Sequence, residues 1–300
     1  PFGTNSSEED GRSLLNMILE IFISLNHCST DFENEFCKSD GIQAFAHCIS
    51  NISKKDIDKF SLPPLYNFYF SFNNEINQAI FLQAFWFNYN VWDKMPVEQH
   101  SFLLTNCLQK ILSKHYEIFK KYISYSFLVS MFKDIPDDNV RDVYFTFIIM
   151  YSKYYFIKED QKFFLHLSFT SKGVFQGQIL KTFYAIMESG NECFYRLYGT
   201  NVYSNLIALS TSSNEETRIY VVKILAWMKN SNKKEPIPLN LAILSFIKTL
   251  NFENITDRSW IELEKMVLDE NKMSERIVEL LPLFACYSHF VDPQLPNNFI

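Results

Sequence analysis

Five residues near the N-terminus form the one cluster in the sequence that could hold a transition metal: His27, Cys28, Cys37, His47 and Cys48. A structural zinc site needs ligand pairs about two to four residues apart, which fix a tetrahedral geometry. Cys28 and Cys37 are nine residues apart, and the neighbours His47 and Cys48 project in different directions from one helix. We therefore predict no metal ligand here, and we interpret these residues as core cysteines and surface histidines.

Acidic residues that could act in acid–base chemistry form two short groups, the first with Asp137, Asp138 and Asp142 and the second with Glu159 and Asp160. Each group lies at or near the start of a helix that the apolar pattern predicts. Carboxylates at such positions accept hydrogen bonds from free backbone N–H groups and complement the helix dipole. Helix capping is therefore the expected role of both groups.

Two glycines, Gly173 and Gly177, stand near a helix start, as glycines of phosphate-binding loops do. The Lys-Ser/Thr pair that completes such a loop is missing, because Gln178 and Ile179 follow the second glycine. No local pattern pairs one of the six histidines with a nucleophile, although a triad assembled from distant positions stays an alternative. The sequence thus predicts no catalytic residue and no cofactor, and it singles out no partner-binding residue.

The composition favours a folded, soluble and helical protein. Hydrophobic residues make up 47% of the 300 residues and charged residues 21%, while glycine and proline are scarce. The net charge of -6 argues against nucleic-acid binding. No window is long and apolar enough to span a membrane. The six cysteines lack the spacing of a disulfide framework, which favours a reducing cytosol.

The elements that must position these residues are amphipathic helices, because apolar residues recur every three or four positions. We expect helices over 8–27, 40–52, 64–72, 74–92, 96–113, 115–121, 124–133, 137–156, 159–169, 174–188, 191–197, 200–211, 214–229, 237–251, 257–268 and 273–288. The predicted helix over 74–92 carries a stripe of aromatic residues. Their helical spacing predicts that they pack in the core, with Trp92 nearest the surface. The members of the stripe are Phe81, Phe85, Trp86, Phe87, Tyr89 and Trp92.

Three similar segments suggest internal repeats. Residues 34–45 show the pattern of a short helix, a turn and a new helix that opens at Gly41, and residues 191–202 and 116–128 repeat the plan loosely. Many short-linked helices with such spacing are typical of armadillo/HEAT-like solenoids. We therefore predict an all-α, helical-repeat solenoid with a flexible leader at 1–12 and a single armadillo-like domain at 13–300. Because the chain opens with Pro1, we expect it to be a fragment of a larger protein.

One family resemblance accompanies these patterns. Residues 39–57 and 82–99 resemble the armadillo-like region upstream of the BEACH module in neurobeachin and beige-like proteins. There a helix ends in a pattern like N-x-x-x-W-x-x-x-P-x-x-x-Q, which Asn88, Trp92 and Pro96 match and Gln99 misses by one position. Residues 142–161 and 216–225 look like further helices of that region, so the resemblance covers about residues 14–229.

The resemblance implies a non-catalytic protein–protein interaction scaffold that acts in vesicle trafficking or membrane dynamics. Its partners would be other proteins on the solenoid surface, without nucleic acid, and membrane association would be indirect through the rest of the parent protein. The expected location is cytoplasmic, including the periphery of intracellular membranes. The alternative is a formin-type armadillo regulatory domain that binds a Rho-family GTPase. An enzyme with an unrecognised site is the third reading.

Overall fold

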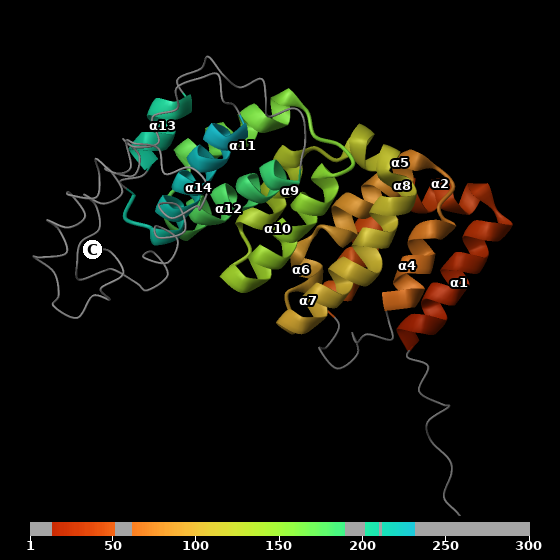
Figure 1. The fold of residues 1–300 in the computed structure, drawn as a ribbon. Helices are drawn as coiled ribbons and strands as arrows, with labels where there is room; N and C mark the ends of the chain where they lie inside the picture. Colours follow the sequence, from red (N-terminus) through yellow and green to blue (C-terminus); the bar gives the residue numbers. More distant parts are fainter. Residues whose placement is uncertain (1–13, 52–61, 190–201, 210–211, 232–300) are drawn as a thin grey trace, which may run out of the picture. The chain divides into compact units, whose positions relative to one another are not determined.

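The computed structural model describes residues 14–51, 62–189, 202–209 and 212–231, and all their regular secondary structure is helical (Figure 1). The prediction of an all-α protein is confirmed for these residues. The chain divides into two compact units, residues 1–155 and 156–300, which are described separately below. The predicted leader and the predicted helices 191–197, 237–251, 257–268 and 273–288 lie outside the described residues. A single domain over 13–300 stays a prediction.

The first unit contains ten α-helices within its described residues and two π-helical turns that interrupt them, η1 and η2. In chain order they are α1 (Leu14–Cys28), α2 (Thr30–Lys38), α3 (Gly41–Ser50), α4 (Leu62–Ser71), α5 (Glu75–Phe81), η1 (Leu82–Trp86), α6 (Tyr89–Trp92), α7 (Val97–Leu103), η2 (Leu104–Leu108), α8 (Gln109–Tyr122), α9 (Tyr125–Lys133) and α10 (Asp138–Ser152). The described part of the second unit contains α11 (Lys158–Thr170), α12 (Gly173–Glu188), α13 (Val202–Leu209) and α14 (Glu215–Ser231).

The turn between α2 and α3 has the form that the sequence predicts for residues 34–45. Asp40 adopts the left-handed conformation with φ of 55°, and α3 begins at Gly41. A Cβ atom at Gly41 would lie 2.4 Å from the backbone oxygen of Phe36, closer than real contacts allow. The turn therefore needs glycine because the new helix starts directly against the end of the previous one.

The prediction of a single helix over 74–92 is wrong, because the helix is interrupted at Phe87 and Asn88. After the π-helical turn η1, Asn88 takes an extended conformation and its side-chain oxygen accepts a hydrogen bond from the Asn90 N–H. Its side-chain amide donates to the carbonyl of Ala84. Asn88 thus ends one helix and caps the next, which a purely apolar pattern does not reveal.

The aromatic stripe is core, as predicted, except for Tyr89, which is half-buried, and Trp92 is not its surface member. Trp92 is 0% exposed, and its Nε1–H donates to the Phe85 carbonyl at 3.1 Å. The ring stacks on Trp86 with centroids 5.6 Å apart. The prediction failed because the break at Asn88 turns α6 and brings the end of the stripe back against its middle.

One arrangement of three helices occurs in both units. α9 begins at Tyr125 and its counterpart α13 at Val202, while α10 begins at Asp138 and its counterpart α14 at Glu215. The number of residues from the start of α9 to that of α13 is therefore the same as from the start of α10 to that of α14. The first helices of the two arrangements, α7 and α12, are offset by nearly the same interval. In the first unit α10 packs against α7 and α9, and in the second unit α14 packs against α12 and α13. The third helix is therefore the common packing partner in each unit.

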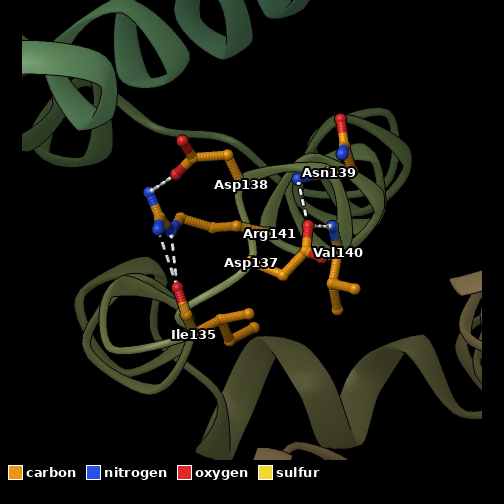
Figure 2. Close-up of polar contacts among 6 residues, drawn as sticks. All are labelled: Ile135, Asp137, Asp138, Asn139, Val140 and Arg141. Atoms are coloured by element: carbon orange, nitrogen blue, oxygen red, sulfur yellow. Dashed lines mark hydrogen bonds and ion pairs between the residues drawn. The ribbon is translucent and has the colours of Figure 1, made fainter. Parts of the chain in front are cut away.

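The start of the third helix has two features in common in both units, an Asx cap and a buried arginine that donates to a loop carbonyl. Figure 2 shows the first copy, in which Asp137 Oδ1 accepts hydrogen bonds from the N–H groups of Asn139 (2.8 Å) and Val140 (3.2 Å). The buried Arg141 donates through Nε and Nη2 to the Ile135 carbonyl at 3.1 and 2.7 Å. Its Nη1 also pairs with Asp138 at 2.8 Å, so the guanidinium ties the preceding loop to the helix.

The second copy repeats two of these contacts, the cap and the arginine bond to the loop carbonyl, at the interval that separates α10 from α14. Asn214 Oδ1 accepts a hydrogen bond from the Thr217 N–H at 2.9 Å, as Asp137 does from Val140. The buried Arg218 donates through Nη1 to the Ser212 carbonyl at 2.6 Å. A loop carbonyl, an Asx cap and a buried arginine thus recur at equal spacing in the two units.

Candidate interaction surface

The structure does not assemble the soft-ligand residues into a metal site. His27, Cys28, His47 and Cys48 are exposed and Cys37 is half-buried, and no group of three or more His, Cys, Asp or Glu residues in the described ranges could hold a metal ion. The interpretation as core cysteines is therefore wrong for Cys28 and Cys48, which lie at the end of α1 and on the outer face of α3. Burial, with the charge of Glu33, raises the pKa of Cys37 to about 11 and keeps this thiol protonated.

Both acidic groups contain helix caps, as predicted. Asp137 caps α10, and Asp160 Oδ2 accepts a hydrogen bond from the Ile157 N–H at 2.9 Å at the start of α11. Burial raises the pKa of Asp160 even though this hydrogen bond lowers it. Each of these carboxylates is thus committed to the backbone of its own helix.

The two glycines mark a helix start, also as predicted. α12 begins at Gly173, whose φ is +63°. A Cβ atom at Gly177 would lie 2.9 Å from Asn214 Oδ1, so this glycine lets the start of α14 approach α12. Between them, the buried Gln176 donates to the carbonyls of Ser168 and Ser171 at 2.8 Å each. Residues 173–177 thus contribute to helix packing and to the hydrogen bonds between α11 and α12.

The most enclosed histidine of the described residues is His100 on α7, which is 1% exposed. Its Nδ1 lies 3.2 Å from the Tyr144 hydroxyl, and its ring stacks on Tyr89 at 6.0 Å. Nε2 has no hydrogen-bond partner among the described residues. Burial lowers the pKa of His100, although the Met95 carbonyl and the charges of Asp137 and Asp93 oppose this. His100 is therefore a neutral core residue that joins α6, α7 and α10.

A surface with exposed aromatic and basic side chains lies on α8, where the helix bends at His115. This residue has a non-helical conformation, with φ of -126° and ψ of 34°. The sequence predicts that one helix ends at 113 and the next begins at 115. The structure instead has a single helix, α8, that bends at this position. Exposed or half-exposed side chains from α4, from α8 and from the turn after α10 lie near the bend and are called the aromatic–lysine strip: Tyr66, Phe70, Lys114, His115, Tyr116 and Tyr154.

The α4 side of the strip is ordered around one lysine. Lys114 Nζ lies 4.9 Å from the centroid of the Phe70 ring and 5.6 Å from that of Tyr66, and the two rings are 4.6 Å apart. Such contacts attract the ammonium to the ring faces. The His115 ring meets Phe70 edge-on, and its Nδ1 lies 3.3 Å from the Tyr69 hydroxyl. Burial and the charge of Lys114 lower the pKa of His115, which favours the neutral ring.

The α10 side of the strip is a pair of exposed tyrosines. Tyr116 and Tyr154 are 40% and 47% exposed and stack with ring centroids 6.1 Å apart. Beyond them, Lys120 Nζ lies 5.5 Å from the Tyr155 ring. Aromatic rings thus lie beside α8 on two sides of its bend, from α4 on one side and from the turn after α10 on the other.

Positive charge follows the same helix. Lys110, Lys114 and Lys120 are exposed, and within the described part of the chain none of them forms an ion pair. Lys121, by contrast, pairs with Glu75 of α5 at 3.2 Å. The sequence gives no sign that aromatic rings lie beside these lysines, because the rings come from residues far apart in the chain.

Comparison of the chain with protein-family models, curated proteins and solved structures finds no match. The BEACH-type resemblance therefore rests on its motif alone. The structure gives that motif local roles, since Asn88 caps α6, Trp92 is core and Pro96 precedes α7. Among the described helices, none combines the length and apolar character needed to cross a membrane.

Proposed function

We propose that this chain is a non-catalytic, armadillo/HEAT-like repeat module that binds other proteins. The observation that carries the proposal is the recurrence of one three-helix arrangement, with the same arginine-braced cap, at an equal spacing along the chain. Repeats of this kind stack through their neighbours and leave an extended surface for partners. The stacking of the two units into a solenoid belongs to the proposal.

The biological setting we propose is that of a BEACH-family scaffold in vesicle trafficking or membrane dynamics, at a cytoplasmic location. Its support is the sequence motif around Trp92 together with the helical character of the described residues. The formin-type regulatory domain remains the alternative, and it differs in an observable way because it would bind a Rho-type GTPase in a nucleotide-dependent manner.

Proximity labelling and affinity purification with the full chain as bait, read by quantitative mass spectrometry, test the proposal. A variant that alters the strip, Lys114→Glu with Tyr154→Ser, is compared with Lys162→Glu, which makes the same charge change at an exposed lysine of α11. We expect the wild-type chain and Lys162→Glu to enrich the same trafficking or membrane-remodelling proteins.

Two results would decide otherwise. Enrichment of a nucleotide-loaded Rho-type GTPase with actin regulators would favour the formin-type alternative. Failure of the wild-type chain to enrich any protein above an unrelated helical bait would refute a protein-binding module.

A further inference from the structure

We propose that the aromatic–lysine strip is a docking site for a short acidic peptide segment of a partner protein. This inference rests on the proposed function and adds to it the place of binding and the chemistry of the partner. The segment would pair its carboxylates with the lysines of α8 and lay its apolar side chains on the exposed tyrosines.

Charge is the first argument. Lys110, Lys114 and Lys120 give α8 an exposed positive charge that no carboxylate of the described residues neutralises by an ion pair. Although α8 also carries one carboxylate, Glu117, its four lysines give the helix a positive net charge, whereas the chain as a whole has a net charge of -6. Complementary charges at an interface rim steer association and suppress wrong partners. An acidic segment is the partner that this local charge fits.

Aromatic exposure is the second argument. Tyrosine is enriched in protein interfaces, where the flat ring supplies contact area and the hydroxyl stays hydrated. Tyr116 and Tyr154 are exposed side by side and stacked, which gives a firm platform beside the lysines. A partner side chain that lies on this platform would add apolar contact to the charge pairing.

Pre-organisation is the third argument. The rings of Tyr66 and Phe70 hold the Lys114 ammonium before any partner arrives. An exposed lysine normally loses rotamer freedom when it binds a partner, which weakens binding. The aromatic contacts reduce that loss, so Lys114 is the strip's best-placed cation.

The same features favour a peptide over a polyanion or a membrane. A polybasic membrane site uses about four to eight basic residues, more than the unpaired lysines of α8. The strip contains no arginine, the residue that recognises phosphate with two parallel hydrogen bonds. The net negative charge of the chain also opposes the approach of a nucleic acid.

The test begins with a displayed library of random twelve-residue peptides selected on the full chain. We expect enrichment of sequences rich in Asp and Glu that also carry an apolar residue. The most enriched peptide, labelled with fluorescein, is then titrated by fluorescence polarisation against the wild-type chain, Lys114→Glu, Tyr154→Ser and the control Lys162→Glu. Far-UV circular dichroism and thermal melting confirm that each variant is folded.

We expect Lys114→Glu to weaken binding by about tenfold or more, because an attraction becomes a repulsion. Tyr154→Ser is expected to weaken it by about threefold or more, and Lys162→Glu by less than about twofold. Affinity for the wild-type chain should fall as salt rises, since exposed charges are screened. Tyr154→Ser keeps the test decisive if Lys114→Glu fails to fold.

Several results would overturn the inference. Selection that enriches no acidic peptide would do so, as would an acidic peptide whose affinity is unchanged in both strip variants. Tighter binding of a poly(U) oligonucleotide or of phosphatidylserine vesicles through Lys114 would assign the strip to another partner class. If the strip variant still recovers every cellular partner of the wild-type chain, the docking site is wrong while the protein-binding module stands.

Discussion

Two buried tryptophans of the first unit provide a matched test of the packing. Trp86 and Trp92 are both 0% exposed and stack on each other, and both contact Phe85. They differ at one atom. The Trp92 Nε1–H donates to the Phe85 carbonyl, whereas the Trp86 Nε1–H has no partner among the described residues. Replacement of each by phenylalanine removes a similar ring volume and isolates the effect of the N–H group.

The expected magnitudes follow from that difference. Trp92→Phe loses a hydrogen bond whose net contribution is about 0.5–1.5 kcal/mol. Trp86→Phe removes an unsatisfied buried donor, whose desolvation penalty is about 1–3 kcal/mol. The cost of the smaller ring is common to both variants and cancels in the comparison. Trp92→Phe should therefore destabilise the fold by about 1.5–4.5 kcal/mol more than Trp86→Phe.

Urea unfolding followed by far-UV circular dichroism measures both free energies, provided that the m values stay equal. Trp92→Ala serves as a reference and should cost about 3–5 kcal/mol, as large-to-small changes in a core do. Equal costs for the two phenylalanine variants would refute the reasoning, because the Trp86 N–H would then have a partner such as a buried water. Unchanged stability of Trp92→Ala would refute the core packing itself.

Three further predictions concern buried polar groups and one close approach. Because burial lowers the pKa of His100, the folded chain binds fewer protons there than the unfolded chain. The free energy of unfolding is therefore unaffected by this histidine above about pH 6.5 and declines as the pH falls below that value, by at most about 1.4 kcal/mol per pH unit. The urea midpoints at pH 7.5 and pH 5.5 should consequently differ more for the wild-type chain than for His100→Gln. Burial alone would raise the pKa of Glu33, but hydrogen bonds from Asn73, Asn77 and Asn74 outweigh it and lower the pKa. The stability that the ionised carboxylate provides is therefore present above its ordinary pKa of 4.5 and is lost as the pH falls. Glu33→Gln should lower the free energy of unfolding by about 2–3 kcal/mol at pH 7 and by less at pH 3, as measured by urea unfolding at both pH values. Gly177→Ala should cost about 1–3 kcal/mol in the same assay because its Cβ would lie 2.9 Å from Asn214 Oδ1, and a neutral result would contradict the close approach of α14.

The helical class and the core could be predicted from the sequence because they depend on local patterns. Apolar spacing identified α9 and α10 closely, and the turn at Asp40 and Gly41 followed from a residue pair with restricted backbone choices. Carboxylates near helix starts also indicated the cap at Asp137. Each of these features is decided within about one or two helical turns.

The remaining features depend on contacts between distant residues. Trp92 is buried because the chain turns at Asn88, and no periodicity distinguishes that turn from a continuous helix. The carboxylate of Glu33 is buried because loop residues some 40 positions away donate hydrogen bonds to it.

The strip is the proposed docking surface, and sequence reasoning missed it. It joins Tyr66 to Lys114 and Tyr116 to Tyr154, pairs that only the fold brings together. The one local signal was the interrupted helical pattern at Lys114, which the structure shows as the bend at His115.

Direct binding of a recovered partner to the purified chain is the measurement that decides whether this chain is a protein-binding module. Isothermal titration calorimetry of the most enriched partner into the full chain gives both the stoichiometry and the affinity. We expect saturable binding at a fixed ratio that Lys162→Glu leaves unchanged. Absence of direct binding for every enriched protein, or turnover of a substrate that a single His or Cys substitution abolishes, would contradict the proposed function.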